Sequence, residues 1–187
     1  MALDPFRIAV FLSLSMTSAG VAQVLWLRTS LSKRLVQPVD FGLTLRGRRL
    51  FGANKTFRGF AVMVPASGLA FLVWSRLFAT GLWDLSVLGW LGLGLIAGLG
   101  FMLGELPNSF LKRQADVAPG DAPKGTALAW LSLVLDRTDS LLGSLFLIWL
   151  VVPLPLVAWV ACLVVGVGVH AFFSWLLYKT GVKRRAG

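Results

Sequence analysis

The segment SVLGWLGLGLIAGLGFMLGELPNSFLKR, residues 86–113, starts as a long apolar run and ends in carboxylate, amide, hydroxyl and cationic side chains. Its apolar part is long enough to cross the hydrocarbon core of a bilayer, which needs roughly 20 helical residues. Comparable apolar segments recur along the chain, and we predict membrane spans near 6–28, 58–79, 86–111, 127–152 and 154–178. The predicted fold is therefore an all-α, polytopic membrane helix bundle of about five transmembrane helices.

The composition supports one integral-membrane domain over residues 1–187. Only 14% of the residues are charged and 57% are hydrophobic, whereas a soluble domain has a charged fraction of roughly 25%. The net charge of +10 would suggest a nucleic-acid partner in a soluble protein. In a membrane protein, basic loops fix the topology instead, so we expect no nucleic acid. The single cysteine, Cys162, excludes an internal disulfide and a cysteine-based zinc cluster.

The distribution of lysine and arginine predicts the topology. These residues gather near 28–58, 112–124 and 179–185. The connection at 80–85 and the one around Pro153 contain none. Because cytoplasmic loops carry the excess of positive charge, five spans place the N-terminus outside and the C-terminus in the cytoplasm. We expect cytoplasmic loops at 29–57 and 112–126, in a protein of the inner or plasma membrane whose site faces the cytoplasm.

The fourth predicted span is interrupted by polar residues. Its two apolar runs are short, and the stretch from Asp136 to Asp139 separates them. One interpretation is a single helix whose polar patch faces the bundle. The other is a re-entrant piece followed by a short span, which is tolerated where irregular backbone is buried in protein.

Polar side chains recur at helical spacing on two of the predicted spans. The first set is Glu105, Asn108, Ser109 and Lys112, and the second is Asp136, Asp139, Ser140 and Gly143. Positions i, i+3, i+4 and i+7 share one face of a helix. Each helix would therefore carry a polar stripe, and the two stripes can face each other. Ionisable groups within a membrane segment are costly, which favours a functional site.

Three of these residues are candidate metal ligands. Carboxylates that converge at low dielectric repel one another and take up protons unless a cation lies among them. We therefore predict that Glu105, Asp136 and Asp139 bind Mg²⁺, with Mn²⁺ as an alternative ion. The competing interpretation is a buried ion-pair network, for example between Asp136 and Arg137 or Lys112.

A glycine-rich, cationic loop, RGRRLFGANKTFRG at residues 46–59, precedes the second span. Glycine allows close approach of the backbone, and lysine and arginine donate charge-assisted hydrogen bonds, so the loop is a candidate phosphate cradle. It is not a Walker A loop, because Lys55-Thr56 follows Ala53-Asn54 instead of a glycine. A positive-inside loop that contacts lipid phosphates is an equal alternative. Beside a carboxylate-bound metal, the loop would indicate phosphoryl or nucleotidyl transfer.

These motifs resemble those of a known family. Residues 104–113 and 136–140 are similar to the G-D-L-x-E-S-x-x-K-R and D-R-x-D-S patterns of phosphatidate cytidylyltransferases. The upstream stretches 38–42, 47–52 and 54–59 resemble the small archaeal relatives, the CDP-archaeol synthases, more closely. The chain departs from the patterns in having Glu105 for the usual aspartate and Asn108 for the glutamate common in bacterial enzymes.

The resemblance implies transfer of CMP from CTP to a phosphorylated membrane lipid, such as phosphatidic acid or an ether-lipid phosphate, with release of pyrophosphate. Carried over by position, Asp136, Asp139 and Glu105 would hold Mg²⁺. The residues that would bind the phosphates and the nucleotide are Asn54, Lys55, Thr56, Arg58, Asn108, Ser109, Lys112, Arg113 and Arg137.

Other functions remain as alternatives. The first is a catalytically divergent membrane module of the same fold that binds anionic lipids or serves as a partner subunit. A transporter is disfavoured, because the chain lacks the expected inverted repeat and its polar groups gather near one membrane face. The small residues from Gly92 to Gly100 would allow close packing of helices within one chain or between two copies, so a homodimer is retained.

Overall fold

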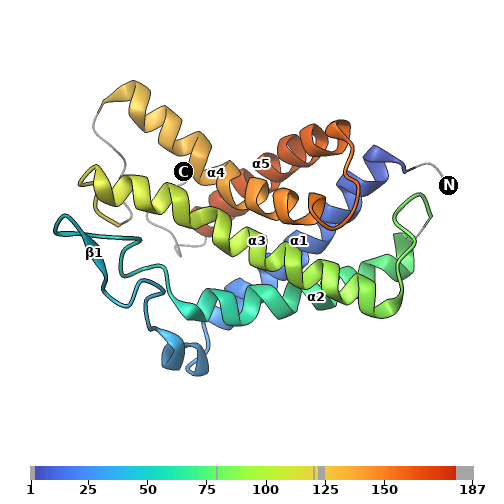
Figure 1. Ribbon diagram of the computed structural model, residues 1–187, viewed down its shortest axis with the longest axis horizontal. Helices are drawn as coiled ribbons and strands as arrows, with labels where there is room; N and C mark the ends of the chain where they lie inside the picture. The colour runs from blue at the N-terminus through green and yellow to red at the C-terminus, as the bar shows by residue number, and fades with distance from the viewer. Residues whose placement is uncertain (1–2, 79, 120, 122–124, 180–187) are drawn as a thin grey trace.

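The computed structural model describes residues 3–78, 80–119, 121 and 125–179. Within these residues the chain forms five α-helices, a short 3₁₀ helix and a two-stranded hairpin (Figure 1). The helices are α1 (Pro5–Leu27), α2 (Phe57–Phe78), α3 (Val87–Gln114), α4 (Thr126–Trp149) and α5 (Leu156–Lys179). The 3₁₀ helix η1 (Leu31–Leu35) and the antiparallel strands β1 (Thr44–Leu45) and β2 (Arg48–Arg49) lie between α1 and α2. The prediction of an all-α membrane bundle is confirmed.

The five helices coincide with the five predicted spans to within a few residues. Among the described residues, α1, α2 and α3 are each long and apolar enough to cross a membrane. No break separates the two apolar runs of α4, so the structure has the single helix with a polar patch. The C-terminal stretch at 180–187 and residues 120 and 122–124 of the predicted second loop lie outside the described residues.

One boundary differs from the prediction. The loop expected at 112–126 starts later, because α3 continues through Gln114 and contains Lys112 and Arg113 in its last turn. Cations are favourable there, since the carbonyl groups at the C-terminus of a helix carry a partial negative charge. The two side chains are therefore held by a helix and not by a loop.

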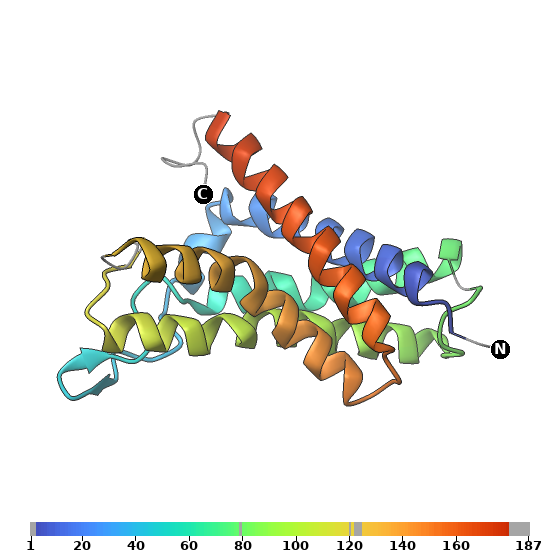
Figure 2. The ribbon, with the colours of Figure 1, turned by 90° about the horizontal axis from the view of Figure 1, so that it is seen from above.

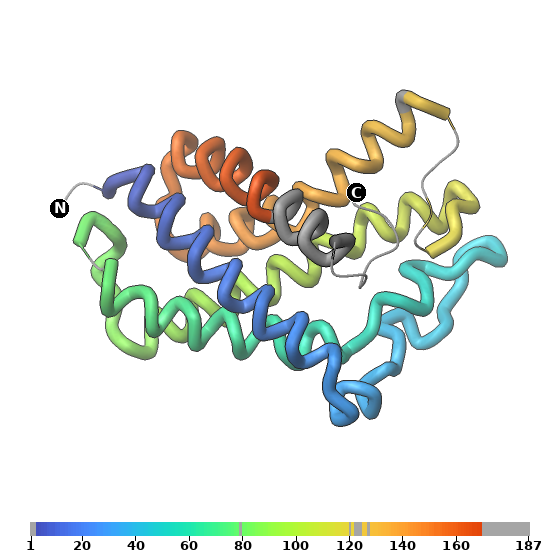
Figure 3. The backbone as a smooth tube through the Cα atoms, turned by 180° about the vertical axis from the view of Figure 1, so that it is seen from behind, coloured from blue at the N-terminus to red at the C-terminus, as the bar shows by residue number. Residues whose placement is uncertain are grey.

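The apolar core lies where α1, α2 and α3 meet. Phe11 on α1 packs edge-on against Phe71 on α2 and Trp90 on α3, with ring centroids 5.1 and 5.2 Å apart. Phe11 and Phe71 are fully buried. Seen from behind (Figure 3), α1 lies between α2 and α5, and it packs against both. α1 is thus a shared wall of the bundle.

The two ends of the bundle carry different connecting segments. In Figure 2 the β1–β2 hairpin lies at one end, beside the C-terminal part of α3, and the start of α1 lies at the other. At the latter end the Asp4 amide donates to the Gly81 carbonyl at 3.0 Å, and the Trp83 indole donates to the Pro153 carbonyl at 2.8 Å. The cationic loop is consequently placed at the same end as the polar part of α3.

Candidate functional site

The site forms where α3 and α4 touch backbone to backbone. A methyl group added to Gly104 on α3 would overlap the carbonyl oxygen of Asp139 on α4 and lie 3.1 Å from Gly143 Cα. A methyl group on Gly143 would in turn overlap the carbonyl oxygen of Gly100. Glycine permits this close approach, as small residues do at helix crossings in membranes. The crossing brings the two predicted polar stripes face to face.

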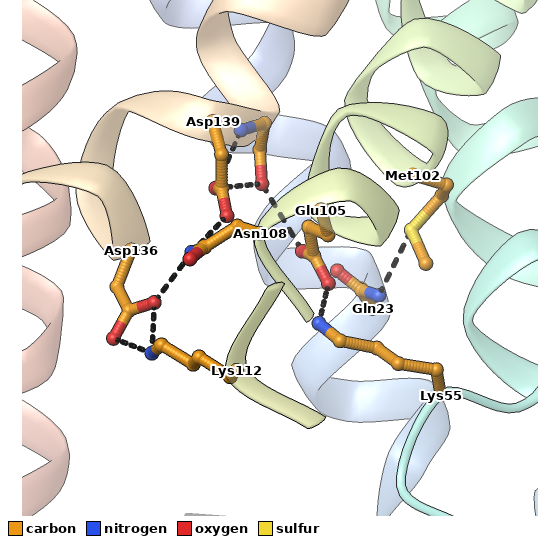
Figure 4. Close-up of polar contacts among 9 residues, drawn as sticks. Gln23, Lys55, Met102, Glu105, Asn108, Lys112, Asp136 and Asp139 are labelled. Carbon is orange, nitrogen blue, oxygen red and sulfur yellow. Dashed lines mark hydrogen bonds and ion pairs between the residues drawn. The ribbon is translucent and has the colours of Figure 1, made fainter. Parts of the chain in front are cut away.

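Asn108 links the two aspartates of α4 (Figure 4). Its side-chain Nδ2 donates to Asp136 Oδ1 at 2.7 Å and to Asp139 Oδ2 at 2.8 Å. One turn further along α3, Lys112 Nζ binds both oxygens of Asp136, with a distance of 2.6 Å to Oδ2. Two positively polarised groups thus compensate the paired carboxylates, which would otherwise repel each other.

Glu105 joins three elements. Its Oε1 accepts a hydrogen bond from Ser140 Oγ on α4 at 3.1 Å, and its Oε2 forms an ion pair with Lys55 of the cationic loop. The Lys55 and Glu105 side chains are both about three-quarters buried. The pair therefore ties the cationic loop to the crossing of α3 and α4.

The cationic loop is organised by Asp40, a residue to which sequence reasoning gave no role. Asp40 is 2% exposed, and its carboxylate accepts from the backbone amides of Gly42, Phe51 and Gly52 at 3.0–3.1 Å. It also pairs with Arg49. Burial raises the pKa of Asp40, but the Arg49 bond and the three amides outweigh it and lower the pKa to about 2. The one hint in the sequence that Asp40 has a role was its position within residues 38–42, one of the stretches that resemble the known family.

Further bonds fasten the loop to its surroundings. The Val39 amide donates to the Lys55 carbonyl at 2.9 Å, and the Phe57 amide donates to Gln37 at 3.0 Å, just where α2 begins. On the other side, Arg48 pairs with Asp116 and donates a hydrogen bond to the carbonyl of Gln114, the last residue of α3. The loop and the polar end of α3 are thereby held as one unit.

Two cavities of similar size meet at the site. The first, about 430 Å³, lies among α1, α3, α4 and α5 and is mainly apolar. Its polar end is formed by Gln23, Glu105, Asp136, Arg137 and Ser140. The second, about 420 Å³, is bordered by the end of α1, the loop and α3, and its polar lining is Gln23, Asn54, Lys55, Thr56, Arg58 and Glu105.

The structure brings most of the predicted site residues together. Six of them form the bonded network just described, namely Lys55, Glu105, Asn108, Lys112, Asp136 and Asp139. Ser109 is buried on α3, and Arg113 lies beside Gly52 at the end of that helix. Within the described ranges, the Nε and Nη1 atoms of Arg113 are buried without a hydrogen-bond acceptor, and Arg113 lines neither of the two cavities.

The carboxylates do not form a compact metal cluster as they stand. In the described part of the chain, no three Asp, Glu, His or Cys side chains lie close enough together to hold a metal ion. Asn108 Nδ2 lies between Asp136 and Asp139, and Lys55 binds Glu105. Lys112 pairs with Asp136, as the ion-pair alternative has it, although Asp136 is nearly half exposed and not buried. The oxygen-rich donor set itself suits Mg²⁺.

Comparisons with known proteins give consistent results. The model of the CarS-like family, described as CDP-archaeol synthase, matches residues 34–185. A CDP-archaeol synthase of Methanoculleus marisnigri is 33% identical over 158 residues, covering 78% of this chain and 87% of the relative. One of Thermofilum pendens is 29% identical over 168 residues, covering 88% and 73%.

A solved structure, described as an intramembrane enzyme for archaeal membrane lipids biosynthesis, has the same fold. Its TM-score is 0.66 at 22% sequence identity, and the match covers 88% of this chain and 91% of that one.

Proposed function

This chain belongs to the CarS-like family of CDP-archaeol synthases, and we propose that it transfers CMP from CTP to the phosphate of an archaeal-type ether lipid. The products are a CDP-lipid and pyrophosphate. The observation that carries this proposal is the Lys55–Glu105 pair, which joins a cationic loop to two facing polar stripes between two cavities. A site of this kind can hold two phosphorylated substrates next to each other.

We assign one substrate to each cavity. The second cavity has Lys55 and Arg58 in its lining, which suits the triphosphate of CTP. The first has an apolar lining that suits hydrocarbon chains and a polar end that suits a phosphate. Since both cavities reach Glu105, the lipid phosphate and the α-phosphate of CTP would meet there.

The proposed reaction needs positioning more than acid–base chemistry. An oxygen of the lipid phosphate attacks the α-phosphorus of CTP, a new P–O bond forms, and the bond to the bridging oxygen of pyrophosphate breaks. The attacking oxygen is already ionised at neutral pH, so no general base is required. Lys55 and Arg58 would hold the two anions, which otherwise repel each other, at reacting distance.

We also propose that Glu105, Asp136 and Asp139 hold Mg²⁺, with Mn²⁺ as a substitute. Rotation of the Asn108 amide by half a turn would exchange its nitrogen for its oxygen, adding a ligand atom of the type that Mg²⁺ prefers. When bound, the metal neutralises charge on the polyphosphate and the leaving pyrophosphate. Lys55 and Lys112 supply the positive charge that the carboxylates need in its absence.

The site is proposed to face the cytoplasm, where CTP is present. The cationic loop and the last turn of α3, with Lys112 and Arg113, lie at the same end of the bundle. The positive-inside rule places that end on the cytoplasmic side.

A direct assay tests the activity. The purified protein in detergent is incubated with CTP, Mg²⁺ and either an archaeal ether-lipid phosphate or phosphatidic acid, and pyrophosphate and CDP-lipid are both measured. We expect equal amounts of the two products, with the ether lipid preferred. Asp139→Asn should reduce turnover at least about 100-fold, because it removes one of the charged oxygen ligands proposed to hold Mg²⁺.

The matched control is Asp116→Asn. Asp116 is an exposed carboxylate outside both cavities, so turnover should change less than about twofold. Wild-type protein that binds CTP without producing either product would reject the transferase and favour a divergent lipid-binding module.

Metal removal gives a separate prediction. Chelation with EDTA should lower turnover at least about 100-fold, since a catalytic metal contributes several kcal/mol to such a transfer. Added Mg²⁺ should restore it. Full activity after chelation and dialysis would show that the lysine-compensated network works without a metal ion.

A further inference from the structure

Gln23 on α1 lies at the junction of the two cavities. Among the described residues, Gln23 and Glu105 line both of them. Glu105 belongs to a predicted motif, whereas Gln23 belongs to none and lies on a predominantly apolar helix. Figure 4 draws Gln23 in the same view as Glu105 and Lys55, with its amide nitrogen directed toward Met102. Its position is therefore the place where the two substrates would meet.

The Gln23 amide has a poor partner in this structure. Its Nε2 lies 3.8 Å from Met102 Sδ, and a thioether is only a weak acceptor. A methyl group on Gly59 would lie 2.7 Å from Met102 Cε and 3.5 Å from Gln23 Nε2, so this glycine leaves the space that the pair occupies. The side chain is thus packed in a defined place, and among the residues that the structure describes this thioether is the one acceptor recorded for its amide.

A neutral amide suits this junction. A lysine or arginine here would pair with Glu105, and a second carboxylate would repel the phosphates. An amide N–H can donate to a phosphate oxygen without either effect. Glutamine therefore supplies a hydrogen-bond donor at a point where a cation would be neutralised by Glu105 and a carboxylate would repel the phosphates.

The course of α1 indicates which substrate the amide serves. Most of the α1 residues at the cavities line the apolar one alone, and these are Leu12, Ser13, Met16, Thr17, Gly20, Val21, Val24 and Leu25. A lipid lying along this helix would bring its phosphate to Gln23. Building on the function proposed above, we propose that Gln23 donates a hydrogen bond to the phosphate of the lipid acceptor and so determines acceptor affinity.

The test separates acceptor binding from CTP binding and from turnover. Binding of a short-chain archaeal ether-lipid phosphate and of CTP is measured by calorimetry on the detergent-purified protein, and KM and kcat are measured for both substrates. Gln23→Leu should weaken binding of the lipid phosphate and raise its KM about tenfold, because one hydrogen bond to a charged group is worth about 1.5 kcal/mol or more. The affinity for CTP should change less than about twofold.

Two further variants keep the result interpretable. Gln23→Glu adds a negative charge and should weaken lipid-phosphate binding more than leucine does. Asp116→Asn removes an exposed carboxylate outside both cavities and should leave lipid binding unchanged. Unchanged CTP affinity in Gln23→Leu shows that this variant is folded.

Lipid-phosphate binding that is equal in wild type and Gln23→Leu would overturn the assignment, and so would a loss confined to CTP. These outcomes are independent of the proposed reaction, since binding is measured without turnover. If the wild type binds both ligands but forms no CDP-lipid, the proposed reaction is wrong. The role of Gln23 is then still decided by the binding measurements.

Discussion

Gly104→Ala is expected to abolish transfer and to lower the free energy of unfolding by about 1–3 kcal/mol or more. The added methyl group would overlap the Asp139 carbonyl oxygen, which is backbone and cannot rotate away. α3 and α4 would have to separate, and Glu105 and Asn108 would lose their bonds to α4. Thermal unfolding in detergent measures the stability, and the pyrophosphate assay measures the loss of activity.

The control for this change lies on the same helix. A methyl group on Gly92 meets no atom within 4 Å. Gly92→Ala should therefore be neutral or slightly stabilising, because alanine favours a helix over glycine by about 0.5–1 kcal/mol. Wild-type stability and activity in Gly104→Ala would contradict the backbone contact between α3 and α4.

The helices and their polar stripes could be predicted because both are local properties of the sequence. The apolar length of each span and the spacing from Glu105 to Lys112 are read directly along the chain. The same spacing suggested that two stripes could face each other. It gave no reason for the crossing point, which Gly104 and Gly143 set through contacts between separate helices.

The parts that the sequence did not reveal depend on contacts between distant residues. Asp40 interacts with amides about ten residues away, in a loop whose many cations drew attention to the positive charge. Gln23 lies on an apolar helix, where one amide has no periodic partner. The sequence also contained no sign that Asn108 would donate to both aspartates of the predicted carboxylate cluster, so that its Nδ2 lies between them.

Asp40→Ala is expected to weaken CTP binding about 100-fold while the helical bundle stays folded. Arg49 is about a third exposed and can be solvated, so the cost comes mainly from the three backbone amides that lose their acceptor, at about 1–3 kcal/mol each. In the variant, part of the free energy of CTP binding, about 3 kcal/mol, would be used to order the loop. This corresponds to the expected loss of affinity of about 100-fold. Calorimetry with CTP measures the affinity, and the rate of limited trypsin digestion at Arg46, Arg48 and Lys55 reports loss of order in the loop.

Acidification distinguishes Asp40 from an ordinary surface acid. Because the folded-state pKa of about 2 lies below the usual 3.8, Asp40 contributes its full stabilisation above pH 4 and loses it only as the pH falls through about 2. The loop of the wild type should thus resist trypsin after a brief exposure to pH 4. In Asp40→Ala the same loop should be cleaved rapidly at neutral pH.

Asp116→Asn is the matched control. Asp116 also pairs with the β1–β2 hairpin, through Arg48, but it is exposed where Asp40 is buried. An exposed pair contributes about 0–1 kcal/mol, so its CTP affinity should fall less than about fivefold. Equal losses in the two variants would mean that the attachment of the hairpin to α3, and not the buried carboxylate, orders the loop. A selective loss in Asp40→Ala would show that the buried acid bonded to the cationic loop is what holds Asn54, Lys55 and Thr56 in place for the nucleotide.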